Sequence, residues 1–258
     1  MTRRDVIIPA GGTINAAYAQ AIGSPHRALA PFGPARVPVL QIVVDALRGS
    51  GCAGQIVCLA PPDVAARIRD VDQWLPASDR GPDNILRGLA ALPSPDAPAW
   101  VCASDLPLLT SDTVAGFAER CDDECAVSVG LVSEGRYNAA YPGAPPSQFV
   151  PLRDAGPVTI SGLFGVRPSA LLAHAGRLAR VFEARKSQAR MARLLGPRLL
   201  WQWATGTLTA QAIAARTERL LHCRVEALAD VAPSLACDMD TADDYTYAHQ
   251  LYTARLVS

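Results

Sequence analysis

Hydrophobic residues in the first half of the chain fall into short, uninterrupted runs that alternate with segments of helical periodicity. The runs predict buried strands over 5–10, 54–61, 99–105, 125–133 and 158–166, with a further short strand at 224–228. The periodic segments predict helices over 37–51, 61–71, 83–92 and 111–121. Strands that are apolar throughout are typical of a parallel sheet covered by helices on both faces.

The pattern changes at about residue 134. Residues 133–156 are rich in Pro, Gly and Tyr, which predicts loops with short strands. A long helical stretch follows over 168–222, and Thr241 with Asp244 forms a capping-box pattern that predicts the start of a last helix. We find no internal repeat, so we expect a single domain over 1–258 in which 168–222 is a helical insertion or lid.

Composition excludes some classes of protein and partner. Half of the 258 residues are hydrophobic, and 24 Lys and Arg balance 24 Asp and Glu, so no global charge points to nucleic acid or a membrane surface. No apolar run is long enough to span a membrane, and the N-terminal apolar stretch is too short for a signal peptide. Seven cysteines without a Cys-x-x-Cys pair predict reduced thiols in a cytoplasmic protein.

Two segments carry candidate chemistry at the carboxyl ends of predicted strands, where ligands bind in sheets of this kind. Ala10-Gly11-Gly12-Thr13 follows the first strand, and its glycines allow backbone N–H groups to approach a phosphate or a base. The alternative is an ordinary tight turn. Asp105 ends the strand at 99–105 and is followed by Leu106-Pro107, so it is either a functional carboxylate or the cap of a turn.

Polar residues elsewhere could join them. Asp238 and Asp240 alternate and would point the same way in an extended segment, which suits a hard divalent cation, although they could instead compensate the dipole of the last helix. Arg27 offers a fork of donors for a phosphate, unless it is one of many surface arginines. Asn84, after the Gly81-Pro82 loop, is available for hydrogen bonds to a base edge.

The order and spacing of these pieces resemble the molybdenum-cofactor nucleotidyltransferase-like enzymes, the MobA-like NTP transferase family. Four segments carry the resemblance: "IIPAGG", "PHRALAPFGPARVPVLQIVVDAL", "VCASDLPLLT" and "DMDTADDYTYA". The chain departs from the family pattern at Pro9, at Arg27 in place of the usual lysine, in "TADD" for "TPED", and in lacking an arginine soon after Gly12. The resemblance implies a three-layer α/β/α fold with a mixed, mostly parallel sheet, the GT-A-like nucleotidyltransferase fold, and a helical C-terminal region.

The implied reaction transfers an NMP group from an NTP to a phosphorylated small molecule and releases pyrophosphate. It needs Mg²⁺, with Mn²⁺ as the possible substitute. By the resemblance, the catalytic residues are Arg27 and Asp105, and the metal ligands are Asp105 and Asp240, with Asp238 as a less favoured substitute. The nucleotide-binding residues are Ala10, Gly11, Gly12, Thr13, Gly81 and Asn84.

Other interpretations stay open. Lys186, the single lysine of the chain, lies in a basic helical segment that either contacts the acceptor substrate or is simply solvated. Trp201 and Trp203 indicate core packing or a dimer contact rather than stacking on the acceptor, so a homodimer is open. The protein could also be a glycosyltransferase that uses an NDP-sugar, or a non-catalytic nucleotide-binding protein. The position of "DMD" at the end of the chain argues against the glycosyltransferase, and metal-dependent pyrophosphate release would separate the three functions.

Overall fold

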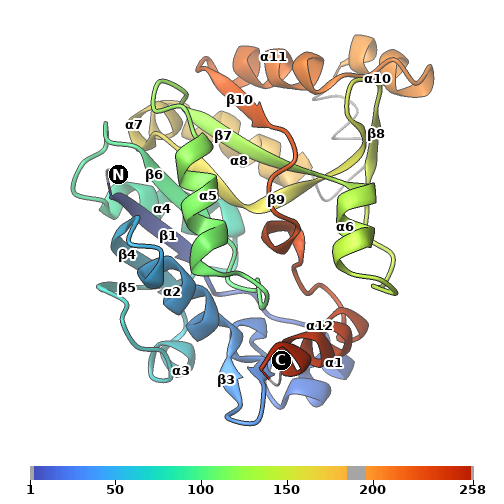
Figure 1. Cartoon of the computed structure of the whole chain (residues 1–258). Coiled ribbons are helices and arrows are strands. Elements are labelled where there is room, and N and C mark those ends of the chain that lie inside the picture. The colour runs from blue at the N-terminus through green and yellow to red at the C-terminus, as the bar shows by residue number, and fades with distance from the viewer. Residues whose placement is uncertain (1–2, 185–195, 257–258) are drawn as a thin grey trace.

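The computed structural model describes residues 3–184 and 196–256, and its centre is an eight-stranded mixed sheet (Figure 1). The strand order is β10-β7-β9-β6-β1-β4-β5, and β8 pairs with β9. Only β9 interrupts the parallel order along this path, because it is antiparallel to both β6 and β7. The strands are β1 (Arg4–Pro9), β4 (Ala53–Ala60), β5 (Gln73–Pro76), β6 (Ala99–Cys102), β7 (Val127–Ser133), β8 (Val150–Leu152), β9 (Gly156–Val166) and β10 (Val225–Leu228).

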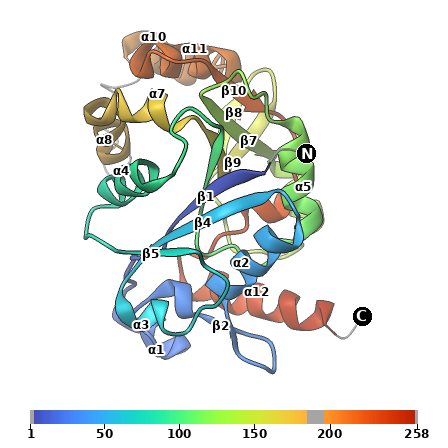
Figure 2. The same cartoon turned by 90° about the vertical axis from the view of Figure 1, so that its left-hand side faces the viewer.

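Helices cover both faces of the sheet, as the apolar strands predict (Figure 2). The helices α2 (Val39–Gly49) and α5 (Ser111–Arg120) pack on one face. The opposite face carries α4 (Gly81–Ala91), α7 (Pro168–Leu172) and α8 (Ala175–Ala184). This arrangement confirms the three-layer α/β/α prediction.

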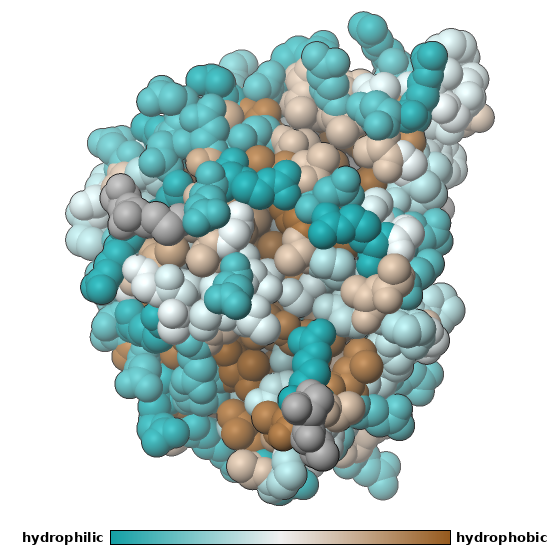
Figure 3. Space-filling model, viewed as in Figure 1, coloured by the Kyte–Doolittle hydropathy of each residue, from teal (hydrophilic) through white to brown (hydrophobic). Residues whose placement is uncertain are grey.

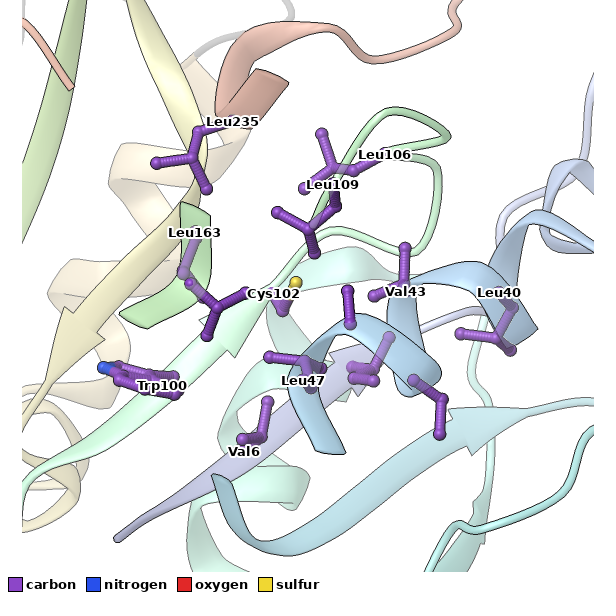
Figure 4. Packing of buried hydrophobic residues seen from close by; sticks show 14 of the residues in the cluster. Val6, Leu40, Val43, Leu47, Trp100, Cys102, Leu106, Leu109, Leu163 and Leu235 are labelled. Carbon is purple, nitrogen blue, oxygen red and sulfur yellow. The ribbon is translucent and has the colours of Figure 1, made fainter. Parts of the chain in front are cut away.

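The main core lies between α2, α5 and the sheet. Leu40, Val43 and Leu47 share one face of α2 and are buried against strand residues such as Val6 and Trp100 (Figure 4). Cys102, Leu106, Leu109, Leu163 and Leu235 extend this core to the carboxyl end of β6. Burial of side chains on both sides of Asp105 therefore fixes the backbone that carries it.

A smaller cluster joins two segments far apart in the sequence. The chain after β1 forms α1 (Ala16–Ile22), η1 (Arg27–Leu29), β2 (Pro31–Phe32) and β3 (Val37–Pro38), and the last helix is α12 (Ala242–Arg255). Phe32 packs against Tyr245 and Tyr252 with ring centroids 5.5 and 5.4 Å apart. Figure 1 shows these segments together at the bottom of the molecule. The cluster brings residues near 27 and 240 to the same end of the sheet.

The remaining elements lie around this frame. The helices α10 (Pro197–Ala204) and α11 (Ala210–Leu221) pack over the β7–β10 end of the sheet, with Leu199 and Leu208 buried against Leu131 and Val158. The other short helices are α3 (Pro62–Ala65), α6 (Glu134–Ala140) and η2 (Pro233–Ala236). The described parts of 168–222 are thus helical, as expected, and a role for them as a lid stays a prediction.

Several local expectations were wrong. Residues 134–140 form α6 rather than a loop, because Tyr137 and Tyr141 lie one turn apart and pack together at 5.1 Å between ring centroids. Gly81 and Pro82 are the first residues of α4 rather than part of a loop, a position that suits proline. The short strand β5 was not expected. Tertiary packing overrides weak local propensity in such segments.

Three further expectations concern the exposure of two tryptophans, the state of the cysteines and the absence of membrane-spanning helices. Trp201 and Trp203 are 65% and 57% exposed, so the core-packing interpretation of these residues was wrong, and the dimer contact stays a prediction. All seven cysteines are free, in agreement with the expected reduced thiols. No helix within the described ranges is long and apolar enough to cross a membrane. Hydrophilic side chains cover most of the face in Figure 3, and hydrophobic ones show mainly in its lower half near the C-terminus.

Candidate functional site

Three carboxylates from distant parts of the chain converge at the carboxyl end of the parallel strands. Asp105 follows β6 and is 8% exposed, whereas Asp238 and Asp240 precede α12 and are exposed. One carboxylate oxygen from each lies within 4.8 Å of the other two. Asp105 and Asp240, predicted as a pair from the sequence, therefore share one site, and Asp238 belongs to it as well.

The capping box of the last helix orients part of this cluster. Thr241 caps α12, and its backbone N–H and that of Asp240 both donate to Asp244 Oδ2, at 2.8 and 3.2 Å. The capping-box prediction is thereby confirmed. Because the cap fixes the backbone at residue 240, the Asp240 carboxylate is held beside Asp105.

Arg27 links the carboxylates. Its Nη1 donates hydrogen bonds to Asp105 Oδ2 at 2.7 Å, to Asp240 Oδ1 at 2.6 Å and to Met239 O at 3.0 Å. The segment that carries Arg27 is tied to the glycine loop, since Thr13 and His26 form a β-bridge and Ile14 N donates to Pro25 O at 3.1 Å. Arg27, Asp105 and Asp240 thus form one unit with the loop after β1.

The charges in this unit are strongly coupled. Burial raises the pKa of Asp105 above its usual range, and Arg27 opposes that shift. Desolvation lowers the pKa of Arg27, but Asp105 and Asp240 outweigh it, so the pKa lies above the ordinary arginine value. The Asp238 carboxyl keeps exposed area, yet protein surrounds most of it, and this desolvation together with Asp105 and Asp240 raises its pKa to about 7. The raised pKa values of Asp105 and Asp238 show that Arg27 alone does not offset the cost of ionising these carboxyls.

The glycine loop packs against the segment after β5. A Cβ on Gly11 would lie 2.3 Å from Ala77 Cβ, so only glycine fits there. Gly12 is different, because nothing lies within 4 Å of the Cβ that it lacks. Ala10 is buried and its N–H donates to Leu59 O at 2.8 Å. Gly12 thus leaves an open side on the loop, next to the Arg27 segment.

Asn84 stabilises the segment after β5 against which the glycine loop packs. It is 4% exposed, its Oδ1 accepts from Ser78 N at 2.7 Å, and its Nδ2 donates to Ser78 O at 2.9 Å. Its amide is thus engaged in shaping the turn that precedes Gly81, and contact of Asn84 or Gly81 with a nucleobase stays a prediction. Lys186 lies outside the described residues.

Sequence reasoning missed Tyr18 as a neighbour of the site. Tyr18 is 1% exposed, and its hydroxyl has no hydrogen-bond partner among the residues that the structure describes. Burial raises the pKa of this phenol, and Arg27 and Asp105 both act on it electrostatically. Its place on a short helix directly after the glycine loop was the only signal in the sequence.

Replacing Tyr18 by Phe is expected to raise the free energy of unfolding, because a buried hydroxyl without a partner costs about 1–3 kcal/mol. Thermal unfolding would show this as a Tm higher by a few degrees. Tyr245→Phe is the matched control, since the Tyr245 hydroxyl donates to Pro31 O at 2.9 Å and its loss lowers stability. An equal loss of stability in both variants would mean that Tyr18 has a partner in solution.

The donor set of the site fits a hard divalent cation. All three groups that converge are carboxylates, and Mg²⁺ prefers oxygen ligands. Mutual repulsion among Asp105, Asp238 and Asp240 is an electrostatic reason for a cation to bind there. Assignment of Asp105 and Asp240 as its ligands stays a prediction, and Asp238 is the third candidate.

Comparisons with known proteins agree with this geometry. A family model described as the MobA-like NTP transferase domain matches residues 6–199. A solved structure of a hypothetical transferase from Thermus thermophilus is similar with a TM-score of 0.82 at 24% identity, over 95% of this chain and 100% of that one. No curated protein matches the sequence.

Two further solved structures share the fold at lower similarity. One is a 2-C-methyl-D-erythritol 4-phosphate cytidylyltransferase, also from Thermus thermophilus, with a TM-score of 0.54, 15% identity, and 97% and 99% of the two chains covered. The other is a CMP:2-keto-3-deoxy-manno-octonic acid synthetase complexed with CTP, with a TM-score of 0.58, 12% identity, and 99% and 100% covered. At these identities the likeness shows the fold alone.

Proposed function

Because the chain belongs to the MobA-like NTP transferase family, we propose that it is a Mg²⁺-dependent enzyme that transfers an NMP group from an NTP to a phosphorylated small molecule, releasing pyrophosphate. One observation carries the proposal. Arg27 and three carboxylates meet beside a glycine loop at the carboxyl end of the sheet. This is where open α/β sheets bind their ligands.

The residues suit attack by a phosphate oxygen on the α-phosphorus of the NTP. A phosphate is already ionised at neutral pH, so the reaction needs no general base from the protein. The demand on the protein is positioning and neutralisation of charge. Backbone N–H groups of Gly11, Gly12 and Thr13 would bind the phosphates, and the Arg27 guanidinium would contact the α-phosphate.

A divalent cation, when bound, would neutralise charge that develops on the phosphates. Asp105, Asp240 and Asp238 are the residues that would hold it. Asp105 comes from the sheet and the other two from the segment before α12, so the ion would also tie the last helix to the centre of the molecule. Mn²⁺ is the expected functional substitute.

The alternatives are weaker on this evidence. A glycosyltransferase would need the Asp238–Asp240 motif to bind a finished NDP-sugar, whereas the matching family is one of NTP transferases. A non-catalytic nucleotide-binding protein would need the glycine loop but would have no evident need for three converging carboxylates. Metal-dependent pyrophosphate release separates these functions.

A pyrophosphate-release screen tests the proposal. Purified protein and Mg²⁺ would be combined with each common NTP and a panel of sugar, alditol and pterin phosphates. We expect release with one NTP and one acceptor, and none when EDTA is present. An NTP that raises Tm only with Mg²⁺, without turnover, would point to an acceptor outside the panel. Neither turnover nor a Tm shift would favour the non-catalytic function.

A further inference from the structure

The Arg27 guanidinium lies between two carboxylates, and a cation bound by the same two carboxylates would need that position. A single atom, Nη1, contacts Asp105 Oδ2 at 2.7 Å, Asp240 Oδ1 at 2.6 Å and Met239 O at 3.0 Å. A positively charged group thus lies among three oxygens, as a bound metal ion does.

A divalent cation held by the same oxygens would compete for this space. Mg²⁺ binds carboxylate oxygens at about 2.0–2.1 Å and accepts little distortion of its geometry. An ion bonded to both Asp105 Oδ2 and Asp240 Oδ1 would lie only a few ångströms from Nη1. Like charges at such a separation repel strongly where Asp105 is buried. A cation that used these two oxygens would therefore compete with Arg27 for them.

The local structure lets the Arg27 side chain leave without disturbing the backbone. Ala28 and Leu29 are buried, and the bridge between Thr13 and His26 fixes the preceding turn. The Arg27 side chain itself is 24% exposed, and the Asp240 side chain that it bonds is 74% exposed. Movement can thus be confined to the side chain, on the solvent side of the site.

We propose that Arg27 is the resident counterion of the carboxylate pair and that a divalent cation binds by displacing it. The inference rests on the proposed function, because it assumes that Asp105 and Asp240 bind the cation. Before the cation binds, Arg27 keeps the two carboxylates assembled. After it binds, the guanidinium is released from both and becomes available to the phosphates of the NTP. Arg27 is thus a positioning residue in one step and a phosphate contact in the next.

Mn²⁺ binding without nucleotide tests the competition, with free Mn²⁺ measured by electron paramagnetic resonance. We expect Arg27→Gln to bind Mn²⁺ at least about ten-fold more tightly than the wild type. In the wild type, only the fraction of molecules from which Arg27 has left can bind the ion, and the apparent affinity falls by that fraction. Equal or weaker binding by Arg27→Gln would overturn the inference.

Arg48→Gln is the matched control for the loss of one positive charge. The Arg48 guanidinium bonds a carboxylate, Asp72, and the backbone oxygen of Gly54, but it is not part of the site. Its Mn²⁺ affinity is expected to stay within about two-fold of the wild type, because Arg48 bonds Gly54 at the start of β4, the end of the parallel strands opposite to the site, and salt screens such remote surface charges. Equal tightening in both variants would overturn the inference in favour of a general charge effect.

Asp105→Asn separates this inference from the proposed function. If Asp105→Asn does not weaken Mn²⁺ binding, the metal site itself is wrong and both proposals fail. If Asp105→Asn abolishes binding but Arg27→Gln does not tighten it, only the displacement of Arg27 is wrong.

Thermal unfolding gives a second readout that does not depend on turnover. Arg27→Gln leaves Asp105 buried without its counterion, so its Tm should fall without Mn²⁺ and should rise more with Mn²⁺ than the wild-type Tm does. If Arg27→Gln does not fold, Arg27→Met keeps a long unbranched side chain without the charge, and the inference requires it to bind Mn²⁺ more tightly than the wild type. Wild-type affinity in Arg27→Met would then overturn it.

Discussion

Replacing Asp105 by Asn is expected to reduce turnover by about a hundred- to a thousand-fold while the protein stays folded. A neutral amide is a poor ligand for Mg²⁺ compared with a carboxylate, and groups that stabilise developing charge typically contribute two to three orders of magnitude to kcat. Pyrophosphate release with the substrate pair found in the screen would measure the loss. Turnover near the wild-type rate would contradict the assignment of Asp105 to the site.

The fold should tolerate Asp105→Asn because the amide has nearly the same shape as the carboxylate. Its oxygen can still accept the hydrogen bond from Arg27 Nη1, and Arg27 keeps its bond to Asp240. Loss of the charge also relieves repulsion on Asp238 and Asp240. Asp123→Asn is the control for loss of one arginine-paired carboxylate outside the site, since Asp123 pairs with Arg4 at 2.5 Å at the start of β1, and it should leave turnover unchanged.

Replacing Gly11 by Ala is expected to destabilise the protein by about 1–3 kcal/mol and to weaken nucleotide binding at least ten-fold. The new Cβ would lie 2.3 Å from Ala77 Cβ, an atom fixed to the backbone that cannot rotate away. The glycine loop and the segment after β5 must therefore move apart. Urea unfolding would measure the loss of stability, and titration with the NTP would measure the loss of affinity.

Gly12→Ala is the matched control for Gly11→Ala, because nothing lies within 4 Å of the added methyl group. Its stability should stay within about 0.5 kcal/mol of the wild type. Adding Ala77→Gly to Gly11→Ala removes the clashing atom and should restore most of the stability, which a double-mutant cycle would show as a coupling between the two positions. If Ala77→Gly and Gly11→Ala were additive, contact between the two segments would not be the cause.

The sequence predicted which residues belong to the site better than it predicted the contacts that they make. Asp105 was recognisable because a carboxylate ends a run of apolar residues, and Asp240 because it comes just before a capping box. The actual contacts of Asn84 were not predictable. Its side chain was expected to be available for hydrogen bonds to a nucleobase. In the structure it forms hydrogen bonds with Ser78 instead, because a buried amide must satisfy its own hydrogen bonds. Tyr18 was missed for a different reason, since its burial involves packing in one cluster with Ala248 of α12, which is remote in the sequence.

In the fold, as in the site, features that depend on local sequence were predicted and features that depend on tertiary contacts were not. Strands β1, β4, β7 and β9 were expected close to their observed bounds, since each needs only a continuous apolar run to be buried on both faces. The expected end of the strand at Asp105 was wrong, because β6 ends at Cys102 and Asp105 lies in the loop that follows. The antiparallel direction of β9 could not be predicted, nor could helix α6. Direction is set by the path of the chain between strands, and α6 depends on packing between Tyr137, Tyr141 and Phe149.

By itself, the amino-acid sequence determined the layered α/β architecture, the positions of Gly11 and Asp105 after strands of the sheet, and the family to which the chain belongs. These properties depend on local periodicity and on motifs of a few residues. Only the tertiary structure decided that Asp238 shares the site and that a single nitrogen of Arg27 bridges Asp105 and Asp240, across 78 and 213 positions of the chain. Distances of 2.6–2.7 Å between such remote atoms are set by the packing of β6, η1 and the start of α12, which no local pattern encodes.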